Sequence, residues 1–231
     1  MYNTTCEEYE SIWRSFLAFD VDYDAVDKHI LTAAKSKHME SAAECAQGIR
    51  ILRQDGWEAV CSFIISQNNN IPRIKKIISS LSAAYGNPVD TQGMEAHGAV
   101  GEEYSFPTSA SILEAGIDGI FALKTGFRAK YIIDAAEKCT NGSVDLSALS
   151  IMPTADGAEA LKTIKGIGDK VAACSLLFGF GHLDSFPVDV WIRRVIERYF
   201  GDGFSPDALG PYAGVAQQFL FYYERWLGGQ S

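Results

Sequence analysis

The segment from Leu161 to Ala172 constrains the fold more than any other part of the chain. It reads Leu-Lys-Thr-Ile-Lys-Gly-Ile-Gly-Asp-Lys-Val-Ala, with two glycines between two stretches of helix-forming residues. Glycine permits positive φ angles and lets another backbone approach closely. The segment predicts a helix, a tight turn held on the core by Ile164 and Ile167, and a second helix whose first N–H groups point outward. Such a helix start suits a phosphate, although the glycines alone favour an ordinary turn between helices.

Helical patterning continues over nearly the whole chain. It is clearest at residues 71–85, where apolar residues recur at steps of three and four. Asn70 can cap this helix, Pro72 fits its first turn, and Gly86 can end it. Similar patterns predict further helices near residues 22–35, 39–52, 56–66, 109–122, 128–140, 155–163, 169–179, 190–200 and 212–227.

Strand signals are weak by comparison. The best of them, from Glu10 to Phe19, fits a short helix equally well. Residues 86–108 are rich in glycine and polar residues, and they form the longest expected loop. We therefore expect an all-α fold of many short helices, the kind that builds grooves between lobes.

Composition places the chain among globular proteins. Hydrophobic residues make up 47% of its 231 residues and charged residues 21%, as in folded soluble domains. Neither a membrane-spanning run nor a secretory signal is visible, so we expect a cytoplasmic protein without membrane contact. Five widely spaced cysteines without a C-x-x-C pair argue against a disulfide framework and against a zinc or iron–sulfur site. They are Cys6, Cys45, Cys61, Cys139 and Cys174.

The charge balance permits a nucleic-acid partner without demonstrating one. The net charge of −9 argues against it, since phosphate contact needs cationic surface. The distribution is uneven, however. Residues 61–89 contain Arg73, Lys75 and Lys76 and no acidic residue, whereas residues 1–60 contain eleven acidic and six basic residues.

Two residues near the hairpin are candidates for chemistry. Lys170 falls in the first turn of the second helix, where the positive end of the helix dipole and partial burial would disfavour its ammonium form. It is thus a candidate amine nucleophile. Asp189 follows Pro187 at the start of another helix, and its simplest role is that of an N-cap. Either residue alone would more often be structural, but the pair around such a hairpin is a rarer combination.

The run from Gly166 to Cys174, followed by Pro187-Val-Asp189, resembles the helix-hairpin-helix, Gly/Pro and Asp signature of the base-excision DNA glycosylases. Within that superfamily the chain is most similar to the 8-oxoguanine DNA glycosylases, and the resemblance extends over nearly the whole chain. Further matches are at residues 62–71 with Arg73, residues 126–131, and residues 211–217 leading to Phe221.

The resemblance implies a two-lobed helix-hairpin-helix glycosylase fold with a groove between the lobes. One lobe would contain residues 56–160, and the other residues 21–55 with 161–231. Residues 1–20 would be a remnant of the family's N-terminal β domain, and we expect most of that domain to be absent. Trp191 stands where better-known members have a phosphate-contacting histidine, so that contact is expected to weaken.

The resemblance also implies a mechanism. Lys170 would attack C1′ of the damaged nucleotide, expel the base, form a Schiff base and allow β-elimination to cut the strand. Asp189 would stabilise positive charge on the sugar. Residues Gly166, Ile167 and Gly168 would bind a DNA phosphate. We expect neither a metal nor a redox cofactor, while a monovalent cation at the hairpin carbonyls is an option that the sequence leaves open.

Two further groups of residues would recognise bases. The flipped base would lie between Cys174 and Phe221, with the Gln217 amide on its Watson–Crick edge. The alternative is a core cysteine, a core phenylalanine and a surface glutamine. Contacts to the orphaned cytosine would come from Asn68, Arg73 and Arg128, for which the alternatives are a helix cap and solvated arginines.

Three functions are compatible with these observations. The first is excision of 8-oxoguanine, preferably opposite cytosine, from double-stranded DNA by a monomeric, nucleoid-associated enzyme. The second is a glycosylase of other specificity, or an enzyme that acts chiefly as a lyase on abasic sites. The third is a non-catalytic helix-hairpin-helix module that binds DNA. Lys170 and Asp189 argue against the third, because a phosphate clamp needs neither.

Overall fold

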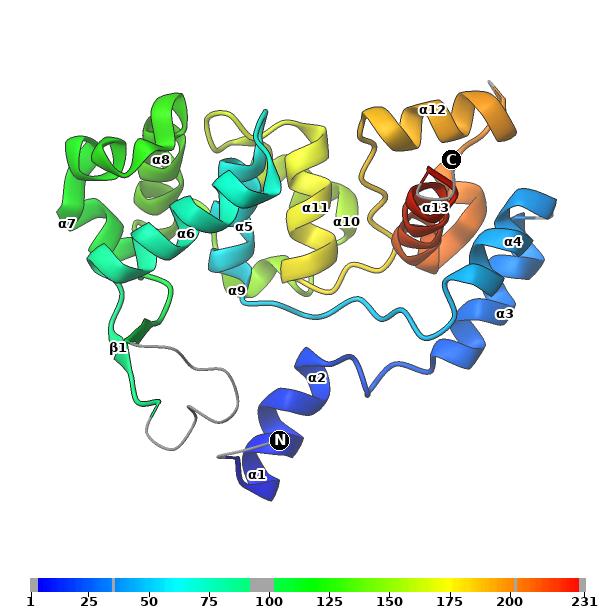
Figure 1. Ribbon diagram of the computed structural model, residues 1–231, viewed down its shortest axis with the longest axis horizontal. Coiled ribbons are helices and arrows are strands. Elements are labelled where there is room, and N and C mark those ends of the chain that lie inside the picture. The colour runs from blue at the N-terminus through cyan, green and yellow to red at the C-terminus, as the bar shows by residue number, and fades with distance from the viewer. Residues whose placement is uncertain (1–3, 35, 92–101, 202, 229–231) are drawn as a thin grey trace. The chain divides into compact units, whose positions relative to one another are not determined.

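The computed structural model describes residues 4–34, 36–91, 102–201 and 203–228, and helices dominate these ranges (Figure 1). The prediction of an all-α fold is therefore confirmed, with one small addition. Strand β1 (Pro88–Val89) pairs antiparallel with β2 (Glu103–Tyr104) inside the expected loop. Within the described ranges, every helix is too short or too polar to cross a membrane.

The chain forms two compact units. Among the described residues, unit one contains Thr4 and Asp55–Ala172, and unit two contains Thr5–Gln54 and residues 173–228. The hairpin thus belongs to unit one, whereas the sequence-based division grouped it with residues 21–55.

Unit one is mainly helical and contains the small sheet. Helices α7 and α8 pack side by side (Figure 1). The helical elements are α5 (Gly56–Ser66), α6 (Ile71–Tyr85), α7 (Ser109–Ile120), the π-helical η3 (Phe121–Thr125), the 3-10 turn η4 (Gly126–Arg128), α8 (Ala129–Thr140), α9 (Leu146–Leu149), α10 (Thr154–Lys162) and the start of α11 (Asp169–Gly179).

Helix α6 begins and ends where its sequence predicts. The Asn70 side chain accepts the N–H of Arg73 at 3.0 Å, and Pro72 stands in the first turn. Gly86 is the C-cap, although its φ of −83° is not left-handed. A Cβ at Gly86 would lie 1.9 Å from the carbonyl oxygen of Ser105. Glycine is needed here because the β2 loop approaches the backbone closely.

Unit two combines the two ends of the chain. Its elements are α1 (Cys6–Glu8), the π-helical η1 (Tyr9–Trp13), α2 (Arg14–Phe16), α3 (Tyr23–Ala34), α4 (Lys37–Cys45), the end of α11, α12 (Val190–Tyr199), the 3-10 helix η5 (Pro206–Tyr212) and α13 (Ala213–Gly228). The segment with the best strand signal is helical, as its alternative interpretation proposed. Helix α4 is shorter than predicted, because the chain turns after it with Gly48 at φ +86°.

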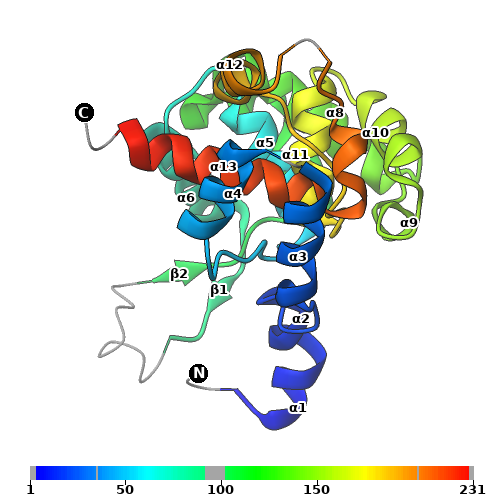
Figure 2. The ribbon, with the colours of Figure 1, turned by 90° about the vertical axis from the view of Figure 1, so that its right-hand side faces the viewer.

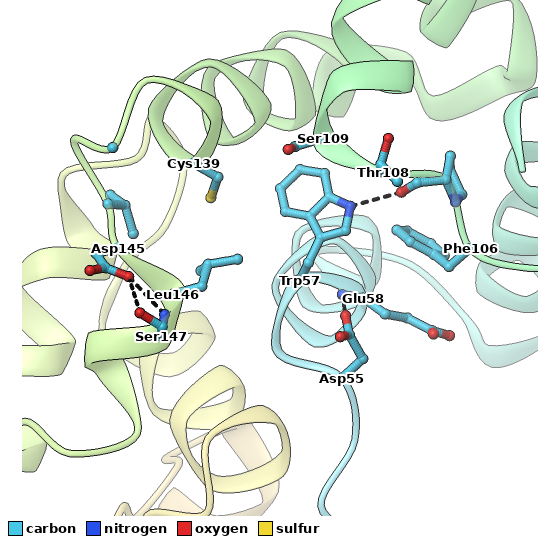
Figure 3. Close-up of a pocket in the computed structure, with 13 residues that line it drawn as sticks. Asp55, Trp57, Glu58, Phe106, Thr108, Ser109, Cys139, Asp145, Leu146 and Ser147 are labelled. Carbon is cyan, nitrogen blue, oxygen red and sulfur yellow. Dashed lines mark hydrogen bonds between the residues drawn. The ribbon is translucent and has the colours of Figure 1, made fainter.

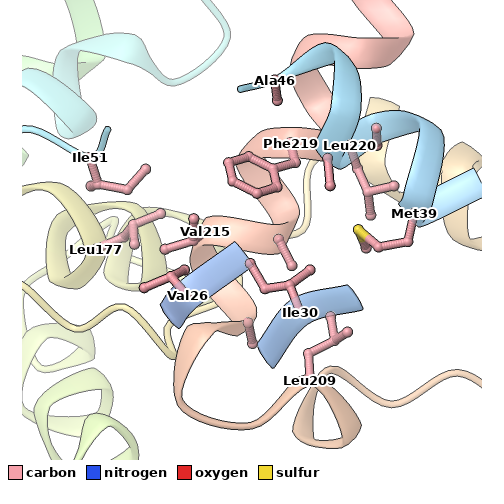
Figure 4. Close-up of a cluster of buried hydrophobic side chains, with 14 of the residues drawn as sticks. Val26, Ile30, Met39, Ala46, Ile51, Leu177, Leu209, Val215, Phe219 and Leu220 are labelled. Atoms are coloured by element: carbon pink, nitrogen blue, oxygen red, sulfur yellow. The ribbon is translucent and has the colours of Figure 1, made fainter. Parts of the chain in front are cut away.

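The core of unit two holds α13 in place. Helix α13 packs along α4 (Figure 2). Between them and α3 lies a cluster of buried apolar side chains (Figure 4). It includes Val26 and Ile30 of α3, Met39 of α4, and Phe219 and Leu220 of α13. Burial of this kind contributes about 1.5–3 kcal/mol per large side chain, so the position of α13 is well determined within its unit.

Candidate functional site

The hairpin between α10 and α11 is anchored as its sequence predicts. Ile164 and Ile167 are 1% and 6% exposed, so both point into the core of unit one. Ile167 N–H donates to the Ile164 carbonyl at 3.1 Å, which closes the turn. The first N–H groups of α11 have no acceptor within the helix and are the predicted anion-binding groups.

The two hairpin glycines differ in what they permit. Gly166 has φ +82°, and a Cβ there would lie 2.3 Å from Cδ2 of Tyr131. Gly168 does not have a positive φ, and apart from Gly168 and its two chain neighbours no described protein atom lies within 4 Å of a Cβ built on it. Gly166 therefore serves the turn and its packing, whereas Gly168 leaves space above the backbone for another molecule.

Lys170 is the second residue of α11, and its side chain is exposed. The expectation of partial burial is wrong, because the turn before it directs the first residues of α11 away from the core. Its Nζ lies 5.8 Å from the ring centre of Phe63, within the range of a weak cation–π contact. Within the described ranges, no carboxylate lies within 4.0 Å of this amine.

Lys162, at the end of α10, provides the contrast. Its amine lies 2.6 Å from Glu159 and 3.0 Å from Asp169. Hydrogen bonds to Glu159 and Asp169 raise the pKa of Lys162 and favour its ammonium form. Of these two lysines beside the turn, Lys170 is therefore the one with an available amine.

Asp189 caps α12, as predicted. Its Oδ1 accepts the N–H of Ile192 at 2.8 Å, and its backbone is extended. The carboxylate is partly buried, so it is held in a fixed place by the helix that it caps. Trp191, in the same first turn, is 58% exposed, and the guanidinium of Arg194 lies 5.8 Å from its ring.

The residues predicted to hold the flipped base are in unit two. Cys174 and Gln217 are 5% and 4% exposed, so the alternative of a surface glutamine is wrong. Oε1 of Gln217 accepts a hydrogen bond from Gln218 at 2.5 Å. Phe221 is partly buried against the core of the unit, one turn after Gln217 on α13.

The three residues predicted to contact an orphaned cytosine lie around one turn of unit one. Asn68 is exposed and has φ +46°. Arg73 is exposed, and its Nη2 donates to the carbonyl of Lys124 at 3.3 Å. Arg128 is 3% exposed, so the alternative of a solvated arginine is wrong for it.

The guanidinium of Arg128 is held by backbone carbonyls. Nε donates to Gln67 at 3.0 Å, Nη2 to Asn68 at 2.9 Å, and Nη1 to Thr125 at 3.2 Å; Nη2 also contacts the Gln67 carbonyl. Burial, together with Arg73, lowers the pKa of Arg128. Most of its donors are therefore engaged in fixing the turn after α5, with few left for a base.

A separate cavity of about 660 Å³ lies in unit one, between α5, α7, α8 and α9 (Figure 3). Trp57 forms one wall and donates from Nε1 to the carbonyl of Pro107 at 2.8 Å. Glu58 and Asp145 line it, and burial raises the pKa of Cys139 on its wall to about 11. The cavity contains none of the predicted site residues. Its acidic lining is unsuited to a phosphate.

Comparison with known proteins assigns the family. A model described as HhH-GPD superfamily base excision DNA repair protein matches residues 61–208, and one described as 8-oxoguanine DNA glycosylase, N-terminal domain, matches residues 2–60. The first match covers more than half of the chain, which therefore belongs to the HhH-GPD superfamily of base-excision DNA repair proteins. The second match extends well past residue 20, where the expected remnant ends.

Individual relatives agree with this assignment. The N-glycosylase/DNA lyase of Saccharomyces cerevisiae is 39% identical over 165 residues, 66% of this chain and 42% of the yeast protein. The solved 8-oxoguanine glycosylase/lyase of Clostridium acetobutylicum, bound to DNA with cytosine opposite 8-oxoG, is 31% identical, with a TM-score of 0.85 over 98% of this chain and 78% of that one. MBOgg1, bound to a low-affinity DNA ligand, is 38% identical, with a TM-score of 0.87 and the same coverage. The chain thus spans less than half the length of the yeast relative.

Proposed function

We propose that this chain excises 8-oxoguanine from double-stranded DNA and cleaves the resulting abasic strand. The observation that carries the proposal is the amine of Lys170. It is exposed, it stands in the first turn after the hairpin, and no described carboxylate pairs with it. The similar Clostridium acetobutylicum protein is an 8-oxoguanine glycosylase/lyase, which supports the choice of lesion, and its DNA ligand supports a preference for cytosine opposite it.

The proposed reaction uses Lys170 and Asp189. The lone pair of the Lys170 nitrogen forms a bond to C1′ while the N-glycosidic bond breaks. The base leaves with the electron pair of the broken bond and takes up a proton that the amine gives up. The nitrogen then expels O4′, which takes a proton from water, so that the sugar ring opens to a Schiff base. Loss of a proton from C2′ finally breaks the C3′–oxygen bond, and the phosphate leaves with that electron pair. The fixed carboxylate of Asp189 stabilises the positive charge that develops on the sugar.

Binding of the substrate uses the remaining predicted residues. The flipped base contacts Cys174, Gln217 and Phe221 in this proposal, and the burial of Gln217 supports a recognition role. Asn68 and Arg73 face the orphaned cytosine, since both are exposed.

The hairpin amides at Gly166, Ile167 and Gly168 bind a phosphate. Arg128 contributes chiefly by holding the turn that carries Asn68. Residues 1–20 belong to the family's N-terminal domain, which the match over residues 2–60 supports.

The test measures strand cleavage on three duplexes: 8-oxoguanine opposite cytosine, 8-oxoguanine opposite adenine, and an abasic site opposite cytosine. We expect cleavage of the first and third, and slower cleavage of the second.

Asp189→Asn should slow base excision about a hundredfold or more without loss of stability, because asparagine caps helices as well as aspartate does. Cleavage of the abasic duplex alone would restrict the function to a lyase, and cleavage of none would favour a binding module.

A further inference from the structure

Asp134 is a buried carboxylate on α8 that faces the hairpin. The residue is 5% exposed. Its Oδ2 accepts the backbone N–H of Lys165 at 2.8 Å and lies 3.0 Å from Nζ of Lys138, and its Oδ1 lies 3.1 Å from Nζ of Lys165. A buried carboxylate is costly unless its oxygens are well partnered. Here both oxygens are engaged by groups that belong to the hairpin or adjoin it.

The charge of Asp134 is maintained by these partners. Burial acts to raise the pKa of Asp134, but the backbone hydrogen bond from Lys165 and the bonds from Lys138 and Lys165 outweigh it and leave the pKa below its ordinary value. The group is therefore an anion in the folded protein near neutral pH, and the ion pairs are present when DNA would bind.

Three residues of α8 form a support for the turn. Tyr131, Asp134 and Lys138 are spaced by three and four residues, so they lie on one face of the helix. Tyr131 packs its ring on Gly166, and Lys138 donates to the carbonyl of Thr163 in addition to its contact with Asp134. These contacts fix the backbone just before the amides that would meet a phosphate.

We infer that Asp134 is a positioning residue, which orients the hairpin amides toward a DNA phosphate through its bonds to Lys165 and Lys138. The inference rests on the proposed function, because it needs DNA as the substrate. A glycine-containing turn can adopt several backbone conformations, and ordering it upon binding would cost affinity. The ion-paired carboxylate selects one conformation before DNA arrives. Asp134 pairs with Lys138 and Lys165 rather than with Lys170, so the effect should fall on binding rather than on the chemical step.

The experiment compares Asp134→Asn with the wild type. Kd is measured by fluorescence anisotropy on a duplex that carries tetrahydrofuran, a stable abasic analogue. The single-turnover cleavage rate is measured at saturating enzyme on a second duplex, which carries 8-oxoguanine opposite cytosine. We expect Kd to rise about tenfold, as for the loss of a charge-assisted contact, while the saturated rate changes by less than about twofold. Glu137→Gln is the matched control, because it makes the same charge change at an exposed position of α8, and it should leave Kd unchanged.

A structural role alone would predict something different. It would lower the temperature of unfolding of Asp134→Asn and leave the Kd of the folded protein at the wild-type value, which would overturn the inference. If Asp134→Asn does not fold, Lys138→Met removes the Thr163 contact while Lys165 still pairs with Asp134, and it should raise Kd in the same direction. An unchanged Kd in that variant would also overturn the inference. Failure of the wild type to bind the duplex would instead overturn the proposed function, and the inference with it.

Discussion

At the scale of single residues, identical amino acids in the hairpin serve different purposes. Gly166 has a left-handed backbone and lies against the Tyr131 ring, whereas Gly168 has neither constraint and borders open space. The sequence alone does not distinguish the two glycines, because either of them fits a tight turn. Only the tertiary contact with α8 distinguishes them.

This difference predicts opposite phenotypes for two alanine variants. Gly166→Ala should lower the free energy of unfolding by about 1–3 kcal/mol, because a strained backbone and a clash are introduced together. Gly168→Ala should change stability by no more than about 0.5 kcal/mol but weaken binding of an abasic-analogue duplex, since its Cβ would fill the space left for a phosphate. Urea unfolding and fluorescence anisotropy measure the two effects. Equal DNA affinity of Gly168→Ala and the wild type would contradict a phosphate at this position.

How far a residue's surroundings can be predicted depends on whether they are local. The cap formed by Asp189 follows from its place before α12, and the structure confirms it. The burial of Arg128 does not follow from its neighbours in the sequence, because two of the three carbonyls that hold it, those of Gln67 and Asn68, are 61 and 60 positions away. The exposure of Lys170 does not follow from its place in the first turn of α11, because it depends on the direction that the preceding turn gives to the helix.

At the scale of elements, helices defined by periodic apolar residues are the most predictable part of the fold. The expected helix at 169–179 coincides with α11, and that at 71–85 coincides with α6. The short α9 and the strand pair β1–β2 were not predicted, because they contain too few residues to show a period. Helix α4 is shorter than its pattern because the chain leaves the helical path before Gly48. The supporting face of α8 was also missed, since its function depends on contacts with the hairpin.

His38 is a residue of α4, and its side chain contacts both α12 and α13. The His38 ring stacks on Tyr199 at 3.5 Å between ring centres, and its Nε2 lies 3.1 Å from Oε1 of Glu224 on α13. Burial lowers the pKa of His38 from its ordinary value of 6.5, Glu224 opposes this change, and the positive charge of Arg198 adds to it. The folded protein therefore favours the neutral imidazole.

The sign of this pKa shift predicts a pH dependence of stability. A depressed pKa in the folded state contributes stability above the ordinary value, and this contribution is lost as the pH falls through the folded-state pKa. Between about pH 7.5 and pH 5.5 the free energy of unfolding should therefore fall more steeply for the wild type than for His38→Gln. The same slope in His38→Gln and the wild type would contradict this role for His38.

At the scale of the whole molecule, the charge distribution reconciles an acidic protein with a DNA substrate. The net charge is −9, but α6 exposes Arg73, Lys75 and Lys76 on a segment without acidic residues. Local cationic surface of this kind suffices for contact with a few phosphates. Family membership could be read from the sequence because the hairpin and the Pro-Val-Asp segment are local motifs. The surroundings of the predicted base-contacting residues could not be read in this way, because these residues come from distant parts of the chain.

The measurement that we would make first is covalent trapping. The protein is incubated with a duplex that carries one 8-oxoguanine opposite cytosine, borohydride is added, and the protein–DNA adduct is separated by electrophoresis. The wild type should form an adduct, because borohydride reduces the Schiff base to a stable amine. Lys170→Gln should form none, whereas Lys162→Gln, which changes the ion-paired lysine before the turn, should still form it. An adduct of equal yield with Lys170→Gln, or no adduct with the wild type on this duplex, would contradict the proposed excision of 8-oxoguanine by Lys170.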